Sequence, residues 1–377
     1  MTWIFQRPDP GSGIRLRDAC GENVQVVAVV IGSNLHLWNR DVHVVLLPNL
    51  ASKIPGVPSL VSWHPPCDQE EDRATEIHCE LLPVARPRLL AFGGHAGQSS
   101  CVQRYDFFAE RWTQLPDMTA NRLLPCCVTL LDRFCFVIGG DRACSMEVYD
   151  LHRDEWRVCK GLLFSRLSFA AASISNEALL ITGGKCGWDR MPWSHAARYD
   201  VHTDLWSAVR PMRQARCGHE AVHLNGQVFV FGGNASVTPD TTIESLASVE
   251  AYDPVSNLWS ERAPLTTARA FFGLAVPNNL VYVVGGTVAK GSCLCSVERY
   301  DPATDAWEVL PSLPRARSHC KAVAVDNLLY VVIGDSPRSG RVAAFYDVDC
   351  FDPATNAWRP ARLEGVRSLT ALAVVVH

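Results

Sequence analysis

Short apolar runs separated by turn residues follow one another along most of the chain, and their order repeats six times after residue 85. In one unit, the apolar-rich segments 219–224 and 227–231 flank Asn225 and Gly226. An Asn-Gly pair in this setting favours a hairpin, because both positions of the tight turn need a positive φ. The same place in other units is held by Asp132 and Arg133, Asn176 and Glu177, Asn278 and Asn279, and Asp326 and Asn327. With a second hairpin around turns such as 301–305, each unit is predicted to be a four-stranded antiparallel sheet.

Three markers recur in every unit. A glycine doublet follows the second apolar run, at Gly93-Gly94, Gly139-Gly140, Gly183-Gly184, Gly232-Gly233, Gly285-Gly286 and, in degenerate form, Gly334-Asp335. An aromatic residue and an aspartate come next, at Tyr105-Asp106, Tyr149-Asp150, Tyr199-Asp200, Tyr252-Asp253, Tyr300-Asp301 and Phe351-Asp352. A tryptophan stands seven residues after each aromatic, at Trp112, Trp156, Trp206, Trp259, Trp307 and Trp358. This regularity indicates a repeat architecture, in which four-stranded sheets bury their faces by stacking radially.

The doublet, the aromatic and the tryptophan at this spacing resemble the Kelch repeat. The resemblance covers residues 86–377 and implies an all-β, six-bladed Kelch β-propeller. It also implies that the glycines let a large aromatic side chain approach the backbone closely. The doublets, tyrosines and tryptophans are therefore expected to have a structural role.

The two ends of the repeat region complement each other. The first unit has an apolar run at 89–92 but no clear inner strand before it, whereas the apolar segment 369–377 has no strand after it. We therefore expect the C-terminal strand to complete the first blade, because closing the ring removes exposed sheet edges.

Residues 1–85 lack the repeat and are interpreted as an N-terminal segment and linker of unknown role. Segments 24–31 and 42–47 have the pattern of a strand pair, whereas the prolines and acidic residues between 55 and 73 are typical of a linker. Animal Kelch-like proteins carry a BTB domain and a helical BACK domain ahead of the propeller, and neither is recognisable here. Segment 77–94 does resemble the passage from BACK into the propeller. The BTB domain is the cullin-binding and dimerising part in that family, so we do not expect this chain to recruit a ligase alone. A truncated or alternative form is one explanation of the departure.

Composition favours a soluble protein of the cytoplasm or nucleus. The formal net charge is −4 without a basic cluster, so no nucleic-acid partner is expected. No segment approaches the roughly 18 uncharged apolar residues of a membrane helix, and the N-terminus has no signal-peptide core. The 15 cysteines lack the spacing of a disulfide framework or a zinc site, and we expect them to be reduced packing residues.

Two sets of loops are expected on one face of the propeller, one after the doublets and one joining neighbouring blades. The first set varies most in length, as expected where function is tuned on a rigid scaffold. Its member 185–198 contains Trp188, Trp193 and His195, with Met191, outside the repeat pattern. These side chains either contact a partner, as exposed tryptophans do at binding hot spots, or fold back onto the blade.

The second set of loops carries an arginine in every copy. These residues are Arg122, Arg166, Arg216, Arg269, Arg317 and Arg367, and the first five each lie ten residues after the tryptophan of their unit. Six guanidinium groups that converge near a channel mouth would suit bidentate recognition of carboxylates or phosphates. The resemblance implies an acidic protein or peptide, because arginines of these loops are among the residues that bind acidic substrate peptides in that family. The alternative is that each arginine is a repeat residue bound to backbone carbonyls of its own blade.

No constellation for catalysis, metal or cofactor is recognisable. His219, His223 and His319 lie near inner strands but lack the spacing and the third ligand of a metal site. Nucleophile-elbow and phosphate-loop motifs are also missing from the sequence. We therefore expect a binding platform that is not an enzyme and needs no cofactor. The resemblance implies a substrate-recognition propeller linked indirectly to a cullin-RING ubiquitin ligase. The alternatives are a cytoskeletal, actin-binding or scaffolding Kelch protein and, more remotely, a propeller enzyme.

Overall fold

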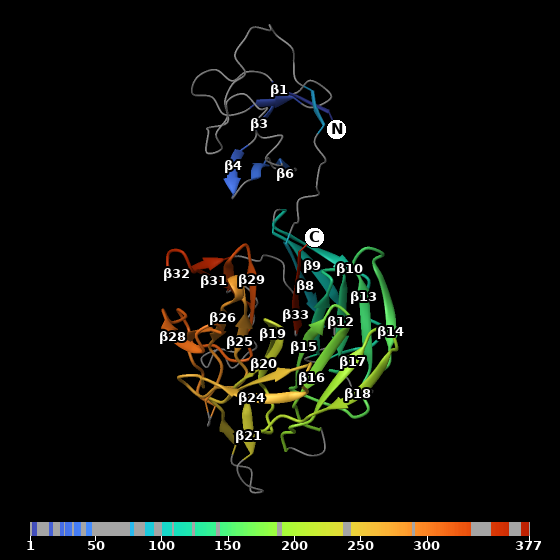
Figure 1. The fold of residues 1–377 in the computed structure, drawn as a ribbon, viewed down its shortest axis with the longest axis vertical. Coiled ribbons are helices and arrows are strands. Elements are labelled where there is room, and N and C mark those ends of the chain that lie inside the picture. Colours follow the sequence, from blue (N-terminus) through green and yellow to red (C-terminus); the bar gives the residue numbers. More distant parts are fainter. Residues whose placement is uncertain are drawn as a thin grey trace. The chain divides into compact units, whose positions relative to one another are not determined.

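The computed structural model consists almost entirely of β-strands and their connections (Figure 1). It describes seven strands within residues 1–78 and then residues 87–93, 100–107, 109–122, 125–140, 144–186, 191–236, 243–288, 291–332, 348–361 and 371–376. The chain divides into two compact units, Met1–Ala85 with His377 and Arg86–Val376. The second unit contains all six copies of the repeat.

Six four-stranded antiparallel sheets form the described part of the second unit, one for each copy of the repeat. Blade 1 contains β8 (Pro87–Phe92), β9 (Val102–Asp106), β10 (Arg111–Leu115) and β33 (Ala371–Val376). Blade 2 contains β11 (Cys126–Leu130), β12 (Phe134–Ile138), β13 (Met146–Asp150) and β14 (Glu155–Cys159). Blade 3 contains β15 (Ala170–Ser175), β16 (Ala178–Thr182), β17 (Ala196–Asp200) and β18 (Leu205–Val209).

The other three blades have the same order of strands. Blade 4 contains β19 (Glu220–Leu224), β20 (Gln227–Phe231), β23 (Val249–Asp253) and β24 (Leu258–Arg262), with a two-stranded ribbon of β21 (Asn234–Ser236) and β22 (Ile243–Ser245). Blade 5 contains β25 (Gly273–Ala275), the 3-10 turn η1 (Pro277–Asn279), β26 (Val281–Val284), β27 (Val297–Asp301) and β28 (Ala306–Leu310). Blade 6 contains β29 (Lys321–Val325), β30 (Leu328–Val332), β31 (Val348–Asp352) and β32 (Ala357–Ala361). The predicted six-bladed propeller is confirmed.

The C-terminal strand closes the ring, as predicted. β33 pairs antiparallel with β8, from Ala371 opposite Phe92 to Val376 opposite Pro87. Blade 1 is thus built from both ends of the repeat region, and its innermost strand is the last strand of the chain. Both edges that would otherwise be exposed are paired, which protects them from pairing with other chains.

The repeat tryptophans join neighbouring blades. Trp206 of blade 3 packs on Tyr199 of the same blade, with ring centroids 5.1 Å apart. Its indole Nε1 donates to Lys160 O, in the loop that leaves blade 2. Both rings belong to an apolar core that is shared by blades 2 and 3. This arrangement confirms a structural role for the repeat aromatics.

The turns and glycines have the backbone geometry that the repeat demands. Asn225 and Gly226 both have positive φ, as predicted for their hairpin. In blade 2, however, the left-handed residues are Leu131 and Asp132, one position earlier than predicted, because Leu130 and Phe134 pair around a three-residue turn. The described doublet glycines have positive φ and are also closely packed. A Cβ atom on Gly232 would lie 2.6 Å from Arg269 O and 3.1 Å from the Phe272 ring.

The first unit contains two small sheets. One has the order β3-β2-β1-β7, from β1 (Thr2–Phe5), β2 (Arg15–Arg17), β3 (Asn23–Gln25) and β7 (Glu76–His78). The other has the order β4-β5-β6, from β4 (Val27–Ile31), β5 (Asn34–Trp38) and β6 (His43–Leu46). Strands do occur within 24–31 and 42–47, but their direct pairing was a wrong prediction because β5 lies between them. In the part of the chain that the structure describes, no helix has the length and apolarity to cross a membrane.

Candidate functional site

The loops after the doublets and the loops between blades adjoin each other. The amide of Gly184 donates to Arg216 O at 2.8 Å, and the amide of Gly233 donates to Arg269 O at 2.9 Å. In each case the doublet of one blade bonds the arginine of the loop that leaves this blade. The predicted single face therefore exists, and backbone hydrogen bonds hold its two loop sets together.

The arginines of this face point into the blades. Arg216 is fully buried, and its Nη1 donates to Gly232 O at 2.7 Å and to Ser248 O at 3.1 Å. Its Nη2 donates to Glu250 Oε1 at 2.6 Å. Glu250 also accepts from the amides of residues 213 and 214, at 2.8 and 3.2 Å. We call this set of an arginine, an acid and two amides the clamp.

The clamp recurs around the ring. The pair is Arg122 with Glu147 in blade 2, Arg269 with Glu298 in blade 5, and Arg317 with Asp349 in blade 6. Backbone amides also donate hydrogen bonds to the acids of blades 2 and 5. Each clamp ties the loop before a blade to the third strand of that blade, which fixes the entry of the chain into the blade.

Burial and hydrogen bonding both shift the pKa values of charged groups in the clamps. Burial raises the pKa of Glu147, but the hydrogen bonds from Thr119 and Arg122 outweigh this effect, so that the pKa lies below its ordinary value. Burial lowers the pKa of Arg216, and the charge of Glu250 offsets part of the change. These contacts stabilise two opposite charges in an interior where either one alone would be costly.

The interpretation of Arg122, Arg216, Arg269 and Arg317 as a partner-binding ring must be corrected. Their side chains are 0–8% exposed and their guanidinium groups already bind an acid of the propeller. The structural alternative is supported for these four residues, although they bind the following blade rather than the preceding one. Arg367 lies outside the described residues.

The acids of the clamps were not predicted from the sequence. They stand two residues before the repeat aromatic, at Glu147, Glu250, Glu298 and Asp349. One signal in the sequence could have revealed them. It is an acid that recurs at one position of a half-buried strand, just before the Tyr-Asp or Phe-Asp pair. It would have shown that an arginine of the preceding loop had a partner within the fold.

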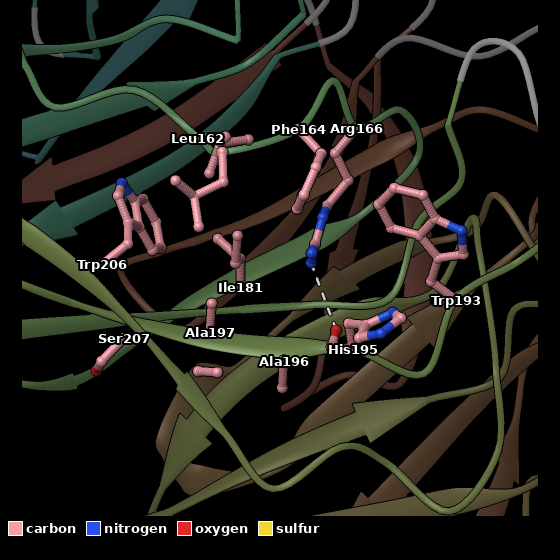
Figure 2. Close-up of a pocket in the computed structure, with 12 residues that line it drawn as sticks. Leu162, Phe164, Arg166, Ile181, Trp193, His195, Ala196, Ala197, Trp206 and Ser207 are labelled. Carbon is pink, nitrogen blue, oxygen red and sulfur yellow. Dashed lines mark hydrogen bonds between the residues drawn. The ribbon is translucent and has the colours of Figure 1, made fainter.

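Blade 3 departs from this pattern, because Ala197 occupies the position of the acid. Arg166 is nevertheless 9% exposed, and its Nη1 donates to His195 O at a long 3.4 Å. Its guanidinium lies over the Trp193 ring, 5.4 Å from the centroid. Burial lowers the pKa of Arg166 to about 10. Figure 2 shows this side chain reaching toward the backbone oxygen of His195.

A pocket of about 410 Å³ opens beside Arg166 (Figure 2). Ile181, Ala197 and Trp206 of blade 3 line it together with Leu162 and Phe164 of the preceding loop. The lining is mostly apolar, and Arg166 supplies a positive charge to it. A few polar groups in an apolar concavity are typical of ligand sites.

Two of the three aromatic residues predicted in the long loop of blade 3 line the pocket. Trp193 and His195 line the pocket, with Trp193 half-buried, His195 exposed and their ring centroids 5.7 Å apart. Trp193 is also fixed by its backbone, whose amide donates to Gly184 O at 2.8 Å. Trp188 lies outside the described residues. Trp193 thus packs on its own loop and at the same time presents part of its ring to the pocket.

Two of the histidines near the inner strands, His219 and His319, have structural partners. His219 is buried, with Nε2 2.8 Å from Thr182 Oγ1, and its pKa is well below the ordinary value because of burial and then of two nearby arginines. His319 stacks on Phe271 at 4.4 Å. Among the described residues, no group of three or more His, Cys, Asp or Glu side chains could hold a metal ion.

The fold and its repeated loops define a Kelch-type β-propeller. The KLHDC2/KLHL20/DRC7 Kelch-repeats domain matches residues 168–371, more than half of the chain, and the chain belongs to this Kelch-repeat family.

Three Kelch-like proteins illustrate the similarity. Human Kelch-like protein 34 is 31% identical over 194 residues, which are 49% of this chain and 29% of that protein. Kelch-like protein 36 of Bos taurus is 30% identical over 204 residues, covering 52% and 32% of the two chains. Human Kelch-like protein 15 is 28% identical over 217 residues, covering 52% and 35%. The chain thus spans about a third of the length of these curated relatives.

Proposed function

We propose that this propeller recognises a protein and presents it to a cullin-RING ubiquitin ligase. One observation carries the recognition part: apolar side chains stand exposed around the blade 3 pocket. Leu163 is 78% exposed and Phe164 is 66% exposed, and both residues line the pocket. Large apolar groups that gather on the surface of a soluble protein mark an interaction site.

The sequence around the pocket is particular to blade 3. The positions of Leu163 and Phe164 are held by Arg213 and Gln214 before blade 4, and by two threonines before blade 5. A structural need of the repeat would act on these positions alike, since every loop joins two blades in the same way. The apolar pair is therefore better explained by a contact that only this loop makes.

The ligase part of the proposal rests on the family. Membership in the Kelch-repeat family and the similarity to three Kelch-like proteins support a role in substrate recognition. The cullin would be reached indirectly, through a bound partner or through a longer form of the chain. We place this activity in the cytoplasm or nucleus.

The full chain, tagged and expressed in cells, tests the proposal by affinity capture. We expect a cullin among the captured proteins and ubiquitin conjugates on a protein captured with it. Capture that contains no cullin, or cosedimentation of the purified chain with filamentous actin, would contradict the ligase role. The second result would favour a cytoskeletal Kelch protein instead.

A further inference from the structure

Blade 3 has the strand pairing of the blades with a clamp, but the strand position of the acid is held by an alanine. Ile181 pairs with Ala197 on neighbouring strands as Val230 pairs with Glu250 in blade 4. The side chain at this register leaves its strand toward the loop arginine. In blade 3 it is a methyl group, so the carboxylate of the other clamps is missing beside Arg166.

The loop that would grip a carboxylate keeps its shape. In blade 4, the amides of residues 213 and 214 donate to Glu250. The matching amides of Leu163 and Phe164 have no acceptor among the described residues. Leu162 precedes them and donates its amide to the preceding blade at 2.8 Å, as its counterpart in blade 4 does at 2.9 Å. Two amides and a guanidinium are therefore arranged around one pocket without an acid.

The charge of the pocket favours an anion. Arg166 is nine-tenths buried, and its described hydrogen bond goes to a neutral backbone oxygen. A buried cation without an acid is unfavourable, and an ionised acceptor forms stronger hydrogen bonds to a guanidinium than a neutral one. None of the described residues that line the pocket is acidic, so nothing in the lining would repel a carboxylate.

We propose that the blade 3 pocket binds the side-chain carboxylate of a glutamate that belongs to the partner protein. The glutamate takes the place of the acid in the other clamps, three of which are glutamates. It accepts from Arg166 and from the amides of Leu163 and Phe164. Apolar residues beside it in the partner pack on the exposed side chains of this loop. This inference deepens the proposed protein recognition and rests on it.

The first experiment restores the clamp from within the chain. In the variant Ala197→Glu, the new carboxylate is expected to bind Arg166 and to raise the melting temperature by about 2–4 °C. Ala197→Gln is the matched control, because it adds nearly the same volume without the charge. A higher melting temperature of Ala197→Glu than of Ala197→Gln supports an acid-accepting site. A melting temperature of Ala197→Glu equal to or below that of Ala197→Gln overturns it.

The second experiment tests an external carboxylate. The probe is the tripeptide Leu-Glu-Leu with an acetylated N-terminus and an amidated C-terminus, titrated into the ¹⁵N-labelled full chain. We expect saturable shifts of the Leu163 and Phe164 amide signals, with at least tenfold weaker binding for the capped Leu-Gln-Leu peptide. Ala197→Glu should bind the glutamate peptide at least tenfold more weakly than the native chain, and Arg166→Met should do the same.

The remaining outcomes are also decisive. Equal binding of the two peptides, or no saturable shift with either, overturns the proposal. Binding of a Leu-Ala-Leu peptide with a free C-terminus, but not of the capped glutamate peptide, assigns the pocket to a terminal carboxylate and overturns the assignment to a glutamate. If Ala197→Glu captures the same proteins from cells as the native chain does, the pocket assignment fails while the proposed protein recognition stands.

Discussion

Trp206 donates its indole N–H to Lys160 O at 2.9 Å, which ties the tryptophan of blade 3 to the loop that leaves blade 2. The same link joins Trp259 to Arg210 O and Trp307 to Ala263 O. In these three blades the neighbouring blade thus supplies a hydrogen bond as well as apolar packing. A ring of this kind should unfold as a whole when a single junction fails.

Replacement of a junction tryptophan should be costly. Trp259 is 5% exposed and packs on Tyr252. We expect Trp259→Ala to lower the free energy of unfolding by about 3–5 kcal/mol, as for other buried large aromatics. Trp259→Phe keeps a ring but loses the hydrogen bond to Arg210, and it should cost less. Urea denaturation measures both; a loss near zero for Trp259→Ala would show that the junction contributes little.

Removal of β33 should open the ring. The strand pairs with β8 along six residues, so its deletion exposes an edge in blade 1. We expect a chain that lacks residues 371–377 to aggregate or to lose its cooperative thermal transition. A chain that lacks only residue 377 is the control. A full deletion as soluble and as heat-stable as this control would contradict closure by the last strand.

Loss of a clamp arginine should reduce stability. Arg216→Ala leaves Glu250 as an uncompensated buried charge, which is expected to cost about 3–5 kcal/mol of unfolding free energy. Glu250→Ala should cost a similar amount, and the double variant should cost less than the sum. Arg213→Ala is the control in the same loop, since it breaks an exposed pair with Glu261. Additive losses for the buried pair would show that the two residues are not coupled.

Acid should destabilise the propeller through His219. Its pKa in the folded protein lies well below 6.5, so the unfolded chain binds a proton that the folded chain does not. Stability should therefore fall as the pH drops through 6.5, by up to about 1.4 kcal/mol per pH unit. His219→Gln should flatten the profile between pH 7 and 5, whereas His202→Gln changes an exposed histidine and should not. Identical profiles for His219→Gln and the native chain would exclude this origin.

The fold could be predicted because the same residue types recur at the same spacing in all six copies of the repeat. The interval of seven residues from the repeat aromatic to the tryptophan recurs in every copy, and in every blade the two rings pack on each other with centroids 5.0–5.1 Å apart. The closing strand was predictable for a related reason, since the first unit lacked a partner that the C-terminal segment could supply. The turn at Asn225 and Gly226 was predicted correctly, because the preference of these two residues for positive φ depends only on the local sequence.

The site was less predictable because it depends on pairs that are distant in sequence. Arg216 and Glu250 are 34 residues apart, and only the stacking of blade 4 on its entry loop brings them together. Without that pairing, an arginine at a repeated register resembles a ligand-binding residue. Arg166 has the same register as the other arginines, and the feature that distinguishes it is the alanine 31 residues further along.

The central claim, that this face recognises a protein, is tested most directly by the proteins that the full chain captures from cells. Quantitative mass spectrometry would compare the native chain with Phe164→Asp and with Val255→Asp, a control at another exposed apolar residue that lies in the turn between β23 and β24. We predict that Phe164→Asp lowers the recovery of the ubiquitinated partner at least tenfold, whereas Val255→Asp leaves it unchanged. Equal recovery with all three chains, at equal melting temperatures, would contradict the account.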